Sequence, residues 1–132
     1  MPVIAFQFNG IEGKRSNQPL KGDLKIHSTP KITEIKEVTL KSLGKKALGM
    51  KFEFKTFYTP EVGNITVDGM ITFVDDKQDD ILAQWKKDQS MPDDVSVEVL
   101  NALFRRCLLR VALLAEDLNL PPPLQFPLVK AK

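Results

Sequence analysis

The chain has 132 residues and a formal net charge of +2. This length is enough for one domain with an apolar core and too short for two. Its 42% hydrophobic and 27% charged residues are typical of globular proteins and argue against a disordered or membrane-spanning chain. A net charge this small does not indicate a nucleic-acid partner, and we expect none. The single cysteine excludes an internal disulfide or a cysteine metal cluster. The start of the chain lacks the basic and apolar regions of a signal peptide, so we expect one cytoplasmic domain over residues 1–132.

Alternating apolar residues predict strands in the first third of the chain. Ile4, Phe6 and Phe8 alternate with polar residues and predict a half-buried strand that ends near Gly10. Residues 13–22 are polar and read as a crossover loop, while residues 24–28 read as a short strand before Pro30, which marks a break or a sheet edge. Residues 33–43 are rich in β-branched side chains; because Ile32 and Ile35 differ in parity, a bulge or twist is expected there.

The next two strands are the clearest in the chain. Apolar residues occupy alternate positions in both of them: Leu48, Met50, Phe52, Phe54, then Ile65, Val67, Ile71 and Phe73. A turn-forming cluster at residues 60–64 separates them, which predicts an antiparallel hairpin with one dry and one solvated face. Gly69 falls within the second strand and predicts a bulge or a close approach of another chain segment.

Two helices are expected after the strands. Asp79 and Asp80 suit the first turn of a short helix that continues through Trp85, because carboxylates interact favourably with a helix N-terminus. A longer helix starts at Pro92 and runs to about Asn119, roughly 40 Å, which matches a strand of eleven residues at roughly 36 Å. Strands followed by helices predict an α+β fold, with a twisted antiparallel sheet of about four strands covered on one face by the long helix.

The long helix carries apolar residues on two sides. A helical projection gives a broad arc suited to covering the sheet: Val97, Leu100, Leu103, Phe104, Cys107, Leu108, Val111, Leu114, Ala115 and Leu118. A second, narrower ridge is formed by Val95, Ala102, Leu109 and Leu113, with Arg106 and Arg110 along one border. A chain of this length has too little other material to cover both sides, so we expect the ridge to form a dimer or tetramer interface. The other interpretation is a helix buried on both sides within one subunit.

The sequence offers little chemistry. His27 is the only histidine and has no nucleophile motif beside it, so a strand-edge or loop position is favoured over a catalytic base. Asp75, Asp76, Asp79 and Asp80 lack the spacing of a calcium loop, and helix capping explains them. The glycines form no phosphate-binding loop. We therefore expect no metal, no cofactor and no enzymatic activity, although scattered residues can still assemble an active site or a small-ligand pocket.

In its order of elements the chain resembles the SecB-like chaperone fold family. The most specific likeness lies after the long helix, where residues 122–128 (PPLQFPL) are similar to the proline-flanked apolar segment that follows the family's main helix. The resemblance implies a four-stranded sheet with a crossover after the first strand, assembly into dimers and tetramers, and binding of unfolded polypeptides in apolar grooves. The chain departs from the family because it leaves no room for a terminal lid helix, and its strand surface is mixed or basic where the family's motor-docking surface is acidic.

These observations lead to one functional prediction and one alternative. The prediction is non-enzymatic, chaperone-like binding of unfolded or extended polypeptides through an apolar groove. The candidate apolar surface residues are Phe57, Tyr58, Met70, Leu124 and Phe126. The alternative is a structural or adaptor subunit that binds one fixed protein partner through its long helix.

Overall fold

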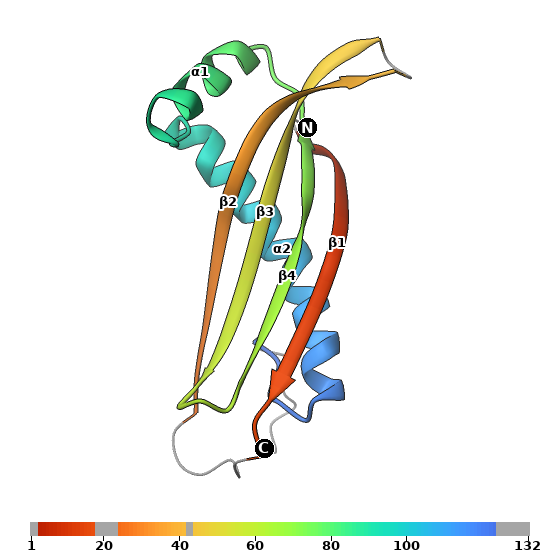
Figure 1. Cartoon of the computed structure of the whole chain (residues 1–132), viewed down its shortest axis with the longest axis vertical. Coiled ribbons are helices and arrows are strands. Elements are labelled where there is room, and N and C mark those ends of the chain that lie inside the picture. Colours follow the sequence, from red (N-terminus) through yellow and green to blue (C-terminus); the bar gives the residue numbers. More distant parts are fainter. Residues whose placement is uncertain (1–2, 18–23, 42–43, 124–132) are drawn as a thin grey trace, which may run out of the picture.

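The protein is an open four-stranded antiparallel sheet with two helices on one face, seen in a computed structural model that describes residues 3–17, 24–41 and 44–123 (Figure 1). The elements follow in the order β1 (Val3–Arg15), β2 (Lys25–Leu40), β3 (Lys45–Thr59), β4 (Gly63–Phe73), α1 (Gln78–Asp88) and α2 (Asp93–Asp117). The spatial order of the strands is β1-β4-β3-β2, so β1 and β2, consecutive in the chain, form opposite edges. The expected α+β class is confirmed.

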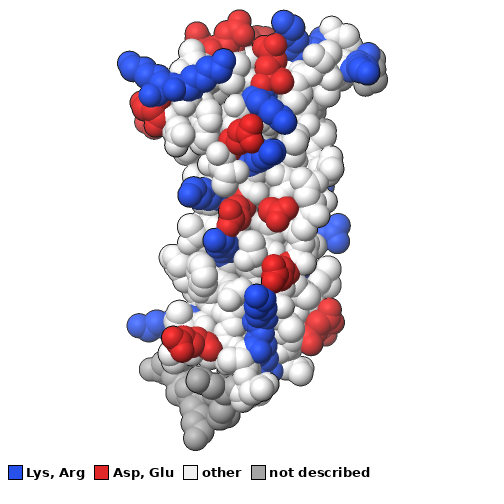
Figure 2. Space-filling view, viewed as in Figure 1, with Lys and Arg blue, Asp and Glu red and all other residues white. Residues whose placement is uncertain are grey.

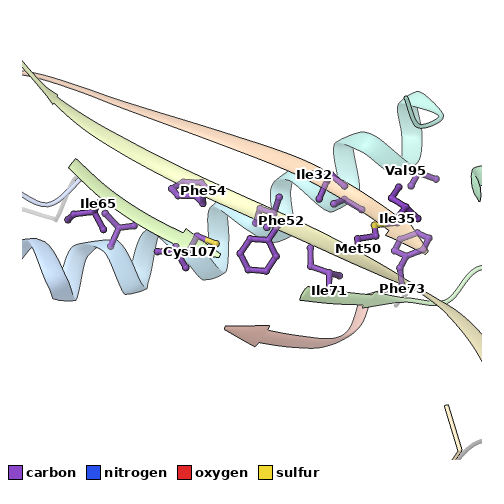
Figure 3. Packing of buried hydrophobic residues seen from close by; sticks show 14 of the residues in the cluster. Ile32, Ile35, Met50, Phe52, Phe54, Ile65, Ile71, Phe73, Val95 and Cys107 are labelled. Atoms are coloured by element: carbon purple, nitrogen blue, oxygen red, sulfur yellow. The ribbon is translucent and has the colours of Figure 1, made fainter. Parts of the chain in front are cut away.

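The hairpin of β3 and β4 forms the centre of the sheet, as its alternation predicts. Phe52 pairs with Gly69 and Phe54 with Val67, and the alternate residues of both strands are buried beneath the helices (Figure 3). The rings of Phe52 and Phe6 lie 5.0 Å apart, which carries the aromatic packing onto the edge strand β1. This face carries the large apolar side chains of β3 and β4, so the helices pack on it.

Strand β1 is longer than the sequence indicates, because it pairs with β4 as far as Arg15 rather than ending near Gly10. A register shift between Phe8 and Gly10 changes which residues face the core and hides the alternation. Gly13 then faces the helix, where a Cβ would lie 2.8 Å from the Leu118 side chain. Residues 13–15 therefore belong to β1 and not to the crossover loop that the sequence predicts over residues 13–22.

Strand β2 is one continuous edge strand, so Pro30 marks a sheet edge and not a break, the two alternatives that the sequence leaves open. Proline is tolerated in an edge strand, since one side of its backbone has no ladder partner. The expected bulge is confirmed: the register shifts between Ile32 and Glu34. As a result Ile32 and Ile35, which differ in parity, are both buried against the core.

Close packing at Gly69 is also confirmed. A Cβ on this residue would lie 2.0 Å from the Gln7 carbonyl oxygen and 2.9 Å from the Phe52 ring. Both neighbours are held by sheet pairing or core packing, so only a residue without a side chain fits between them.

Helix α2 contacts all four strands and crosses behind the sheet from the β2 side to the β1 side (Figure 1). Its buried residues follow at intervals of four: Val95, Val99, Leu103, Cys107, Val111 and Ala115. Because four residues make 400° of rotation, the direction that faces the sheet turns by roughly 200° along this stripe. A helix that crosses a twisted sheet from one edge to the other meets a surface that turns beneath it, which contributes to this rotation.

This rotation corrects two assignments made from the sequence. Val95, placed on the outward ridge, is 6% exposed and belongs to the core, whereas Val97, placed on the sheet-covering arc, is 59% exposed. A helical projection assumes that one direction faces the core along the whole helix. The assumption fails at the start of α2, because the side of the helix that faces the sheet there differs from the side that faces it on average along the whole helix.

Candidate functional site

The solvated face of the sheet carries charges of both signs in ion pairs, some between strands and some within one strand. Figure 2 views this face and shows Lys and Arg side chains mixed with Asp and Glu along its length. Lys51 Nζ lies 3.2 Å from Glu34 Oε2, and Lys55 Nζ lies 2.8 Å from Glu53 Oε1. Neighbouring charges of opposite sign cancel each other's field, so this surface has no uniformly basic patch of the kind that binds nucleic-acid backbones.

A groove lies along the outer edge of β2, where the link between α1 and α2 passes the strand. It has a volume of about 500 Å³, within the usual range for ligand pockets. The apolar part of its lining consists of Pro30, Ile32, Trp85, Met91 and Leu100. Gln89, Ser90 and Ser96 add polar groups. An open groove of this composition can take apolar side chains while its rim hydrogen-bonds to amide groups.

Local structure explains why the groove residues meet. Helix α1 ends at Asp88 and is capped by Gln89, which has a left-handed backbone conformation with φ of 57° and donates its N–H to the Trp85 carbonyl oxygen. Ser90 accepts a hydrogen bond from Gln84 Nε2 at 2.9 Å. The chain then turns through Met91 into Pro92, the N-cap residue of α2. This tight corner brings Trp85 and Met91 beside strand β2.

The outward side of α2 is a second candidate surface. Leu109 and Leu113 are 58% and 61% exposed, and the half-buried Ala102 lies on the same side. Arg106 and Arg110 stack over the rings of Phe6 and Phe8, with centroid distances of 5.3 and 5.1 Å. These contacts place both arginines on the flank of α2 that faces β1. Exposed leucines one helical turn apart are a common feature of helix–helix interfaces.

The apolar residues proposed from the sequence do not form one groove. Phe57 is exposed on the solvated face near the β3–β4 turn, whereas Met70 is half-buried on the same face, six residue pairs further along the β3–β4 ladder. Tyr58 is buried, and its hydroxyl donates a hydrogen bond of 2.7 Å to the Pro121 carbonyl oxygen, which removes it from the surface set. Leu124 and Phe126 lie outside the described residues.

Burial makes the one cysteine a poor nucleophile. It raises the pKa of the Cys107 thiol to about 12, although the nearby Arg106 charge acts to lower this pKa. Burial also raises the pKa of Tyr58 to about 12. His27 is exposed on the edge strand β2, as expected, and its Nε2 lies 3.0 Å from Thr29 Oγ1.

The acidic residues near the start of α1 have structural roles. Asp75 Oδ1 accepts a hydrogen bond from the Lys77 N–H, and Gln78 Oε1 accepts one from the Asp75 N–H. Asp79 and Asp80 lie in the first helical turn, as the sequence predicts. In residues 3–17, 24–41 and 44–123, no three or more His, Cys, Asp or Glu side chains gather in a way that could hold a metal ion. Over the same ranges, neither helix combines the length and the apolar character needed to cross a membrane.

Sequence reasoning missed the groove because its residues come from three separate elements. The sequence places Trp85 in the short helix, but no pattern near Trp85 indicates that the end of this helix lies beside Pro30 of β2. A bulky aromatic residue and a methionine on either side of a short helix–helix link were the only available signal.

No known protein family, curated protein or solved structure matches this chain. The resemblance to the SecB-like fold therefore stays a prediction, and the α+β arrangement of one sheet and two helices stands on the structure alone.

Proposed function

We propose that this protein binds unfolded or extended polypeptide segments without chemical conversion, in the groove between β2 and the α1–α2 corner. The observation that carries the proposal is the composition of the groove, in which Trp85, Met91 and Leu100 line an open channel beside an edge strand. Methionine and aromatic side chains adapt to partners of varied shape, which suits a site that takes many sequences.

The groove accommodates side chains better than it extends the sheet. Pro30 has no backbone N–H, and the bulge after Ile32 shifts the register of the same stretch of β2. A bound strand could not continue an unbroken hydrogen-bond ladder along this edge. Affinity would come mainly from burial of one or two apolar side chains, with Gln89 and Ser96 available to the peptide backbone.

Trp85 provides a direct test, because it is the only tryptophan of the chain and lines the groove. We expect titration with a tryptophan-free, unfolded apolar peptide to shift its fluorescence emission to shorter wavelength as the indole loses water. In parallel, a stoichiometric amount of the protein should suppress aggregation of a chemically denatured model substrate. Failure to suppress at any ratio, together with unchanged Trp85 emission, would reject the proposed function.

Two variants locate the site. Met91→Glu introduces a charge into the groove and should weaken peptide binding at least about tenfold, since a desolvated charge opposes apolar burial. Phe57→Glu makes the same change on the solvated face, outside the groove, and should leave binding unchanged. Thermal unfolding of both variants controls for loss of fold. The opposite pattern, with Phe57→Glu inactive and Met91→Glu active, would place binding on the solvated face instead.

A further inference from the structure

We infer that the solvated face of the sheet carries a pocket for a nucleoside, with the base held between Phe57 and Lys14 beside the β3–β4 turn. The inference is independent of the peptide groove, which lies along the outer edge of β2. The pocket lies where the end of β1 meets the turn (Figure 1), and its volume of about 500 Å³ is typical of ligand pockets. Its lining includes Lys14, Ser16, Phe57, Thr59, Glu61 and Asn64.

The strand register builds a slot across three strands. Lys14 on β1 and Phe57 on β3 both pair with Asn64 on β4, so the three side chains form one row on the same face. Asn64 is half-buried between its two exposed neighbours and forms the floor of the slot. The walls are two interstrand spacings apart, about 9.5 Å, whereas a flat ring in van der Waals contact with both walls needs about 7–8 Å. A planar aromatic ring therefore fits between them.

The two walls are suited to stacking. Phe57 is 39% exposed, so part of its ring is open to a ligand, and nucleobases stack on such rings. Lys14 Nζ lies 3.4 Å from Glu12 Oε1, and Glu12 precedes Lys14 by two residues on the same face of β1. This ion pair directs the ammonium along the strand, so the aliphatic stem of Lys14 is left as the opposite wall.

The Asn64 floor offers hydrogen bonds to the edge of the ring. Its side-chain amide has an acceptor oxygen and a donor nitrogen side by side. Adenine presents the complementary pair, an amino donor next to a ring-nitrogen acceptor, and asparagine binds this edge through two hydrogen bonds. A plain aromatic ring would leave the amide without a partner in the slot, so the floor favours a nucleobase.

Groups that bind hydroxyls lie at the turn end of the slot, where the sugar of a nucleoside would lie. The Glu61 carboxylate accepts hydrogen bonds, and Thr59 Oγ1, which donates to the Lys25 carbonyl oxygen, has acceptor capacity left. Ser16 Oγ is buried and has no hydrogen-bond partner in the part of the chain that the structure describes. A rotation about its Cα–Cβ bond would turn it toward the pocket, where a sugar hydroxyl would satisfy it.

The charges of the lining favour an uncharged nucleoside over a phosphate ester. Arg15 Nη1 donates to the carbonyl oxygens of Leu118 and Asn119 at 2.9 and 3.1 Å, and Lys14 is paired with Glu12. Glu61 adds a negative charge that would repel a phosphate. Within the lining that the structure describes, positive charge is therefore not in surplus, as it would be in a site for a nucleotide or a nucleic-acid backbone.

Titration with adenosine, followed by two-dimensional NMR of the isotope-labelled full chain, tests the site. We expect saturable shifts of the Asn64 side-chain amide and the Phe57 backbone signals, with a Kd below about 1 mM. Ribose alone should cause no such shifts, because it has no ring to stack. Adenosine monophosphate should bind no more tightly than adenosine. The absence of saturable shifts up to about 1 mM adenosine, or tighter binding of adenosine monophosphate or oligoadenylate, would overturn the inference.

Two variants separate a binding role from a structural one. Phe57→Ala should weaken adenosine binding at least about tenfold, because the base loses its stacking platform. Asn64→Leu keeps a floor of similar volume without its hydrogen bonds and should also weaken adenosine binding about tenfold. Purine riboside, which lacks the amino group, should lose less affinity in Asn64→Leu than adenosine does.

Met91→Glu, in the peptide groove, is the control and should leave adenosine binding unchanged. Thermal unfolding checks the fold of all three variants. Adenosine binding that Phe57→Ala leaves intact, or an equal loss for adenosine and purine riboside in Asn64→Leu, would contradict the proposed position of the base.

Discussion

The two sides of α2 have similar apolar residues and very different environments. Leu103 on the sheet-facing side is fully buried, whereas Leu109 on the outward side is 58% exposed. Val95 and Val97, two residues apart, show the same contrast near the start of the helix, at 6% and 59% exposure. The difference shows that hydrophobicity alone does not assign a helix face. The path of the sheet beneath the helix decides which residues are covered.

The largest expected effect comes from removing a side chain of the sheet-facing stripe. Leu103→Ala should lower the free energy of unfolding by about 2–5 kcal/mol, because it removes buried apolar contact and leaves a cavity between α2 and the strands. Val97→Ala is the matched control on the outward side and should change the free energy by less than about 0.5 kcal/mol. Urea denaturation at equilibrium measures both. Equal costs for the two variants would mean that the two sides do not differ.

The sequence alone predicted the parts of the fold that depend on local alternation. The β3–β4 hairpin, the bulge after Ile32, the close approach at Gly69 and both helices are all confirmed. Each follows from a pattern within a short stretch of chain, such as a change in parity or an acidic helix start. Physical rules that act between near neighbours are sufficient there.

The remaining features depend on contacts between distant residues. The end of β1 was missed because Gly13 packs against Leu118, more than one hundred residues later in the chain. Val95 and Val97 were exchanged because the twist of the sheet turns the buried side of α2. The groove beside Pro30 was missed because it exists only where α1 ends against β2. No pattern within a short stretch of sequence indicates these contacts between distant residues, so only the tertiary structure reveals them.

Thiol reactivity gives a second way to compare the two sides of α2. Cys107 lies on the sheet-facing stripe, and burial raises its pKa to about 12 from an ordinary value of 9.0. At pH 8 its thiolate is scarce, so we expect an aromatic disulfide reagent to modify it on the order of a thousandfold more slowly than an exposed cysteine. Val97→Cys in a Cys107→Ala background supplies that exposed cysteine on the outward side. Similar rates for the two thiols would contradict the burial of Cys107.

The same shift gives stability a defined dependence on pH. The unfolded chain releases the Cys107 proton near pH 9, whereas the folded chain holds it to about pH 12. Stability is therefore complete below pH 9 and decreases as the pH rises toward 12. In Cys107→Ala the decrease should be shallower, with the part that remains coming from Tyr58, whose pKa burial also raises to about 12. Denaturation at pH 8 and pH 10.5 measures the difference.

The smallest expected effect lies on the solvated face of the sheet, where burial cannot amplify a charge interaction. Glu34→Gln removes the partner of Lys51, and both side chains are 48% exposed, so the free energy of unfolding should fall by less than about 1 kcal/mol. Added salt should reduce even that difference, because exposed charges are screened. Denaturation at low and high ionic strength measures the effect. A loss of several kcal/mol that persists in high salt would contradict this expectation, because it would require the ion pair to be shielded from water. The charged face of the sheet would then be a covered surface, like the sheet-facing side of α2.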